Sequence, residues 1–85
     1  MIPIHATATG DPQQLRWVIA AERMPPAGSV RRAPGRLGVL LDYGVISEMV
    51  VGTADVLITL SAGQRWRELG DDIREALSDA LLEPA

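Results

Sequence analysis

Alternation of apolar and polar residues predicts two antiparallel hairpins in this chain. In the first, Ile2–Thr9 and Leu15–Glu22 alternate with a period of two, and the turn residues Gly10, Asp11 and Pro12 break the pattern between them. In the second, four turn-forming residues join Val45–Val51 to Val56–Leu60. We therefore expect four main strands, each with one apolar face.

The same alternation assigns side chains to the two faces of the sheet. Leu15 and Trp17 fall on the apolar face of their strand, where they would contact the core. The residues that we expect on the exposed face, and therefore as contacts for a partner, are His5, Arg16, Val18, Ile46, Glu48 and Val50. Met49 and Val51 are the alternative outward pair, because a shift of one residue exchanges the two faces of a strand.

A period of three to four residues predicts two helices. The first carries three leucines between Pro34, which suits the first turn of a helix, and Gly44, which suits its end. The second contains the apolar positions Trp66, Leu69, Ile73, Ala76, Leu77, Ala80 and Leu81. It has two possible starts, a capping box from Ser61 to Gln64 and the pair of aspartates after Gly70.

This order of elements predicts an α+β fold in one domain of 85 residues. We expect a two-layer sandwich in which two helices cover one face of a largely antiparallel sheet of four to five strands, in the order β-β-(β)-α-β-β-α. The optional strand is a short edge strand around Gly28–Arg31, inside the proline-rich and glycine-rich stretch Met24–Gly35.

Composition narrows the classes of function. The chain has no cysteine, which excludes disulfides and thiolate metal sites, and its net charge of −3 makes nucleic acid an unfavoured partner. No apolar run approaches the length of a membrane span, so we expect a cytoplasmic protein with no membrane contact.

Residues for catalysis or metal binding are sparse. His5 is the one histidine, and the spacing of the acids does not suggest further ligands around it, so we interpret it as a surface residue of the first strand. None of the serines lies in a nucleophile elbow or close in sequence to a base. We expect no enzyme activity, no catalytic or metal site and no cofactor.

Three arginines form the strongest candidate site. Arg31, Arg32 and Arg36 lie where the loop meets the start of the first helix, and guanidinium groups bind carboxylates and phosphates. They are the candidate residues for binding a partner or an anion. The alternative interpretation is a solvated loop whose arginines pair with the acids of the chain itself.

Across nearly its whole length the chain resembles the N-terminal domain of the Nfu iron–sulfur scaffold proteins, a domain that also occurs in small stand-alone bacterial proteins. The matching positions, in chain order, are Pro12, Leu15, Trp17, Gly28, Ser29, Arg31, Arg32, Ala33, Pro34, Gly44, Val45, Gly52, Asp55, Val56, Ile58, Thr59, Trp66, Leu69, Asp72 and Ile73. The chain departs from the pattern at Val50–Val51, where the family has an aromatic pair, and at Asp71, where it has a proline.

The resemblance implies a protein-interaction module accessory to iron–sulfur cluster assembly. The family holds its cluster with a Cys-x-x-Cys pair in a separate C-terminal domain, so this chain would not hold a cluster itself. The expected partner is a protein of iron–sulfur assembly or one of its clients. The alternative function, from the residues alone, is a small anion-binding or nucleic-acid-binding domain that uses the same three arginines.

Overall fold

The computed structural model describes residues 4–19 and 26–82. Its elements follow chain order as β1 (Ile4–Ala8), β2 (Gln14–Ile19), β3 (Gly28–Ser29), α1 (Gly35–Asp42), β4 (Ile46–Val51), β5 (Asp55–Leu60) and α2 (Trp66–Leu82). The predicted α+β class and order of elements are confirmed. The predicted ends of the first two strands, at residues 2–3 and 20–22, lie outside the described residues.

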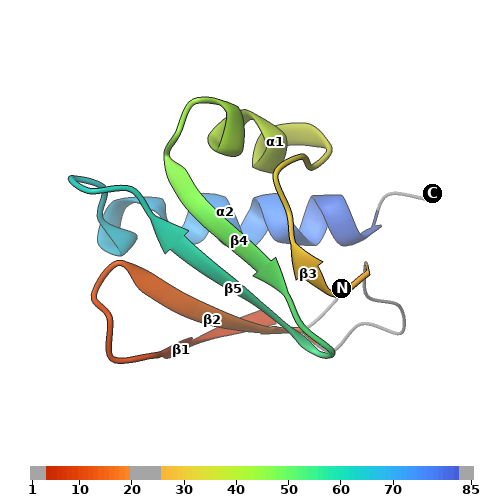
Figure 1. The fold of residues 1–85 in the computed structure, drawn as a ribbon, viewed down its shortest axis with the longest axis horizontal. Helices are drawn as coiled ribbons and strands as arrows, with labels where there is room; N and C mark the ends of the chain where they lie inside the picture. Colours follow the sequence, from red (N-terminus) through yellow and green to blue (C-terminus); the bar gives the residue numbers. More distant parts are fainter. Residues whose placement is uncertain (1–3, 20–25, 83–85) are drawn as a thin grey trace.

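The strands form one antiparallel sheet of five, in the spatial order β1-β2-β5-β4-β3. Both predicted hairpins are present, and pairing of β2 with β5 joins them at the centre of the sheet. The predicted edge strand is also present but short, because only Gly28 and Ser29 pair with β4. Figure 1 shows α2 crossing behind the sheet and α1 lying beside α2 near the start of β4.

A β-bulge in β4 changes which residues face the core. Ile46 pairs with Leu60 and Glu48 pairs with Thr59, so Ser47 is an extra residue between two successive pairs. The bulge turns Ile46 inward, where its exposed fraction is 2%. The prediction that Ile46 lies on the exposed face is therefore wrong, because strict alternation does not continue across a bulge. Glu48 is exposed, as predicted.

The core lies between the sheet and the helices. Ile58 on β5 and Ile73 on α2 are fully buried, both with an exposed fraction of 0%. The rings of Trp17 and Trp66 lie 5.8 Å apart with their planes tilted by 55°, a contact that adds about 0.5–1.5 kcal/mol to burial alone. The buried hydrophobic residues in the described part of the chain are Ile4, Trp17, Ile19, Leu37, Ile46, Met49, Val51, Val56, Ile58, Leu60, Ile73, Ala76 and Leu77.

Helix α1 begins and ends close to the predicted residues. Pro34 is the N-cap, with φ at −73°, so its fixed ring geometry directs the chain into the first turn. Gly44 follows the helix with φ at +75°, a left-handed conformation that glycine adopts without steric cost. Leu37 is the residue of α1 that enters the core.

Helix α2 is a single helix that runs through Gly70, and it begins later than the predicted capping box. The hydroxyl of Ser61 donates to the carbonyl of Gly44, and the backbone N–H of Gln64 donates to the carbonyl of Ser61 at 3.1 Å. Ser61 therefore holds a turn between β5 and α2 and does not cap the helix. The spacing from Ser61 to Gln64 is that of a capping box, but the Ser61 side chain bonds instead to Gly44, in the turn after α1.

Candidate functional site

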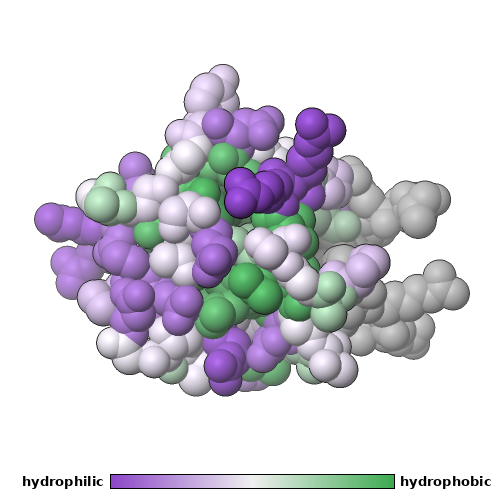
Figure 2. Space-filling model, in the orientation of Figure 1, coloured by the Kyte–Doolittle hydropathy of each residue, from purple (hydrophilic) through white to green (hydrophobic). Residues whose placement is uncertain are grey.

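The face of the sheet opposite α2 has a partly apolar centre. Leu57 on β5 lies directly opposite Val50 on β4 and diagonally from Val18 on β2, and all three are half-buried. Figure 2 shows hydrophobic surface near the centre of this face, bordered by hydrophilic side chains. The predicted contacts Val18 and Val50 are thus on this face, and Leu57, which the alternation did not single out, lies between them.

Polar residues frame this apolar centre. Arg16 lies 3.5 Å from Asp55, with both side chains more than a third exposed at 53% and 38%. His5 and Glu48 are exposed at the two sides of the same face. The predicted contacts His5, Arg16 and Glu48 are therefore accessible, but Arg16 already has a carboxylate beside it.

The three loop arginines have different neighbours in the fold. Arg36 lies 3.7 Å from Asp72 of α2, and both side chains are more than half exposed, at 58% and 57%. This pair fits the alternative interpretation, in which an arginine pairs with an acid of the chain itself. Arg31 lines a polar hollow that Glu48 also lines. The three guanidinium groups therefore do not form one shared binding point.

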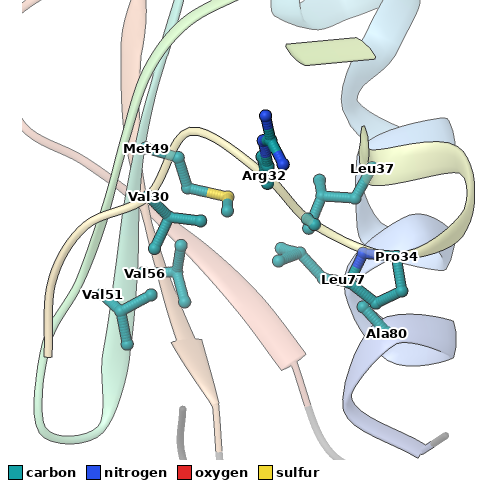
Figure 3. Close-up of a pocket in the computed structure, with 10 residues that line it drawn as sticks. Val30, Arg32, Pro34, Leu37, Met49, Val51, Val56, Leu77 and Ala80 are labelled. Atoms are coloured by element: carbon teal, nitrogen blue, oxygen red, sulfur yellow. The ribbon is translucent and has the colours of Figure 1, made fainter. Parts of the chain in front are cut away.

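Arg32 lines an apolar pocket of about 130 Å³ between the sheet and α2. In Figure 3, side chains from the sheet side of the pocket face Pro34 and Leu37 of the α1 region and Leu77 and Ala80 of α2. Among the described residues that line the pocket, Arg32 is the one that carries a charge; these residues are Val30, Arg32, Ala33, Pro34, Leu37, Met49, Val51, Val56, Leu77 and Ala80. The pocket can accept one apolar side chain next to a positive charge.

Local sequence explains how Arg32 comes to this position. The backbone N–H of Val30 donates to the carbonyl of Met49 at 2.8 Å, which holds the chain along β4 for one residue beyond β3. Pro34 then ends the extended segment by starting α1. Arg32 lies between these two anchors, on a short stretch that crosses from the sheet to the helix layer, and its side chain is exposed.

Small side chains leave the pocket unfilled. Ala33 and Ala80 each contribute only a methyl group, and both are half-buried against the core. A larger residue at either position would occupy part of the space between β4 and α2. Sequence reasoning missed the pocket because its walls come from segments about fifty residues apart, although Arg32 itself was a predicted site residue.

The part of the chain that the structure describes offers little for metal binding or for crossing a membrane. No cluster of three or more histidine, cysteine or acidic residues is placed to hold a metal ion within residues 4–19 and 26–82. Helix α2, the longer described helix, is too short and too polar to cross a membrane, and so is α1. The acids Asp71, Glu75 and Asp79 are exposed along α2.

Comparison of the chain with protein-family models, with curated proteins and with solved structures gave no match.

Proposed function

We propose that this protein is a non-enzymatic interaction module that binds an extended, acidic segment of a protein partner in the Arg32 pocket. In this binding mode, one apolar side chain of the partner enters the pocket and a neighbouring carboxylate pairs with Arg32. The observation that carries the proposal is the composition of the pocket, whose described lining residues are apolar except for one arginine with an exposed guanidinium.

The apolar walls supply the anchor. A volume of about 130 Å³ suits one leucine, methionine or phenylalanine side chain and is too small for a cofactor. Full burial of such a side chain contributes about 1.5–3 kcal/mol. This anchor alone would give weak binding, because association also costs translational freedom and side-chain entropy.

Arginine supplies the charge selectivity. Among the described residues, neither Arg31 nor Arg32 has an acidic group within ion-pair distance, whereas Arg36 has Asp72. Arg32 is therefore free to pair with a carboxylate of the partner, and an arginine–carboxylate pair can form two parallel hydrogen bonds. A partner segment that places aspartate or glutamate beside its apolar anchor fits this arrangement better than a basic or neutral one.

The resemblance to the Nfu N-terminal domain suggests the kind of partner. Under this proposal the partner belongs to iron–sulfur cluster assembly or is one of its client proteins, and the cluster itself is held by the partner, since this chain has no cysteine. Nucleic acid is the weaker candidate, because the three arginines lie apart and the net charge is −3.

Fluorescence anisotropy with short labelled peptides tests the binding mode. Each peptide carries one central leucine, methionine or phenylalanine flanked by aspartates, and a matched set carries lysines in place of the aspartates. We expect the acidic peptides to bind with dissociation constants on the order of 0.1–1 mM and the lysine peptides to bind at least about tenfold more weakly.

Three variants separate the pocket from the general surface. Ala80→Leu fills the pocket and should abolish binding without lowering the melting temperature. Arg32→Ala should weaken binding about tenfold, and Arg31→Ala combined with Arg32→Ala should weaken it no further, because Arg31 lines a different hollow; both should keep a melting temperature close to that of the wild type. Arg65→Ala, at an exposed position before α2, is the matched control and should bind normally. Equal binding by wild type and Ala80→Leu would sink the proposal.

A further inference from the structure

The two edges of the sheet are protected to different degrees. Strand β3 closes one edge with only two residues, and such a short edge offers few free backbone groups. Strand β1 forms the other edge with five residues, Ile4–Ala8, which include no proline, no arginine and no acidic residue. Native proteins usually protect a long edge with charges, proline or a bulge, and β1 has a regular register without these features.

The outward backbone groups of β1 can be assigned from the register. The N–H of Ile19 donates to the carbonyl of Ala54 at 3.0 Å, so Ile19 directs its backbone groups toward β5. Its partner in the neighbouring strand is Ile4, which must therefore direct its own groups away from β2. Because the direction alternates along a strand, Ala6 and Ala8 also direct their N–H and carbonyl groups outward.

A hydrogen bond from α2 agrees with this assignment. A guanidinium nitrogen of Arg74 donates to the carbonyl of Ile4 at 2.8 Å. A carbonyl already bonded within the β1–β2 ladder would leave less room for this contact, whereas an outward carbonyl is accessible to it. The carbonyl has a second lone pair, so the contact does not prevent it from accepting another N–H.

No described residue covers the helix side of the β1 edge. Ala6 and Ala8 lie on the same face of β1 as the buried Ile4, yet both are exposed. A hollow of about 300 Å³ lies between β1 and α2, lined by His5, Ala6, Leu15, Trp17, Gly70, Asp71 and Arg74. A further strand beside β1 would cover this hollow as well as pair with the outward backbone groups.

We propose that β1 pairs antiparallel with β1 of a second copy of this chain, around a two-fold axis at Ala6. In this register Ala6 is opposite Ala6 of the second copy and Ile4 is opposite Ala8 of the second copy. All the outward residues then fall in hydrogen-bonded pairs, which gives about six backbone hydrogen bonds. The two sheets become one continuous sheet of ten strands, twice the five of one chain.

The side chains around this axis favour a second copy over an unrelated peptide. His5 faces Thr7 of the second copy, and alanine meets alanine at the centre, so the register places no like charges opposite each other. Asp71 and Arg74 both line the hollow, one turn apart on α2. The two-fold axis sets the two α2 helices antiparallel, an arrangement in which each copy offers the other both a negative and a positive group. A surface that matches itself in this way is typical of symmetric dimers.

Sedimentation equilibrium over about 10 µM to 1 mM protein tests the association. We expect wild type to pass from monomer to dimer in this range. Ala6→Pro should stay monomeric, because proline removes the outward N–H that the pairing needs but none that the β1–β2 ladder uses. Ala6→Ser keeps the N–H and should dimerise like the wild type.

Amide hydrogen exchange of the wild type gives a second readout that needs no variant. The amides of Ala6 and Ala8 should become protected as the protein concentration rises, while those of His5 and Thr7 should be protected throughout. A wild type that remains monomeric at about 1 mM would overturn the proposal. So would a dimer in which the Ala6 and Ala8 amides exchange freely, or protection of these amides only after an unrelated peptide is added.

Discussion

At the residue scale, two helical glycines occupy opposite environments. Gly38 in α1 is buried, and a methyl group added there would collide with the backbone carbonyl of Ala33. At Gly70 in α2, a methyl group would have no atom within 4 Å apart from its sequence neighbours and the backbone of its own helix. The first glycine is required by a close approach of two chain segments, and the second is not.

Substitution of these glycines by alanine should therefore change the free energy of unfolding in opposite directions. Gly70→Ala should stabilise the protein by about 0.5–1 kcal/mol, the usual gain in helix propensity. Gly38→Ala should destabilise it by more than about 2 kcal/mol, because the backbone of Ala33 must move. Urea denaturation of both variants measures the two changes. If Gly38→Ala proved as stable as Gly70→Ala, the contact between α1 and the segment before it would be wrong.

The direction of single side chains could be predicted wherever the strand is regular. Alternation placed Trp17 inward and Val18 outward, and the register of β2 confirms both. Ile46 was assigned to the wrong face because of the bulge at Ser47, and no residue there gives the usual glycine signal of a bulge. Bulges depend on how two strands meet, so the composition of one strand is insufficient to locate them.

At the element scale, the side chain of Gln13 connects the loop between β1 and β2 to the turn before α2. The amide nitrogen of Gln13, in the β1–β2 loop, donates to the carbonyls of Ser61 at 2.9 Å and Gln64 at 3.0 Å. These carbonyls belong to the turn before α2. The amide nitrogen of Gln14 donates instead to the hydroxyl of Thr59 at 3.1 Å on the exposed sheet face.

Neighbouring glutamines thus make a matched pair for mutation. Gln13→Ala removes two hydrogen bonds between separate elements and should lower the free energy of unfolding by about 1–3 kcal/mol. Gln14→Ala removes one bond between side chains at a half-exposed position and should lower it by less than about 1 kcal/mol. Thermal denaturation of the two variants compares them, and equal losses would contradict the role given to Gln13.

The end of a helix could be predicted from the sequence where the residue that determines it acts at its own position. Pro34 and Gly44 marked the ends of α1 because their backbone preferences act at their own positions. Neither of the two possible starts marks the beginning of α2, because Ser61 bonds to Gly44, a residue of a different turn, and the helix continues through Gly70 without a break. A local motif could not reveal that competing partner.

At the scale of the whole molecule, the proposed function depends on a pocket that the side chains between the sheet and the helices leave unfilled. The sheet and α2 enclose most of the core, but beside the segment that joins β3 to α1 they leave the Arg32 pocket. The sandwich itself could be predicted, because each amphipathic element needs an apolar surface to cover it. The pocket could not, because Met49, Val56 and Ala80 meet only in the folded chain.

The surroundings of the three arginines could not be predicted from the sequence either. Adjacency in sequence suggested one binding point for Arg31, Arg32 and Arg36, but the chain turns between them and gives each a different neighbourhood. Only Arg32 combines a free guanidinium with apolar walls among the described residues. The proposed binding site therefore contains one arginine, Arg32, and its pocket, and not all three arginines.

The most direct test of this claim is a titration of the ¹⁵N-labelled protein with the acidic leucine peptide, followed by amide resonances. We predict that the largest shifts fall on Val30–Leu37 and on Leu77–Ala80, two of the segments that line the pocket, and that they disappear in Ala80→Leu. Shifts confined to the open face around Val18, Val50 and Leu57, or no shifts at about 1 mM peptide, would contradict the account.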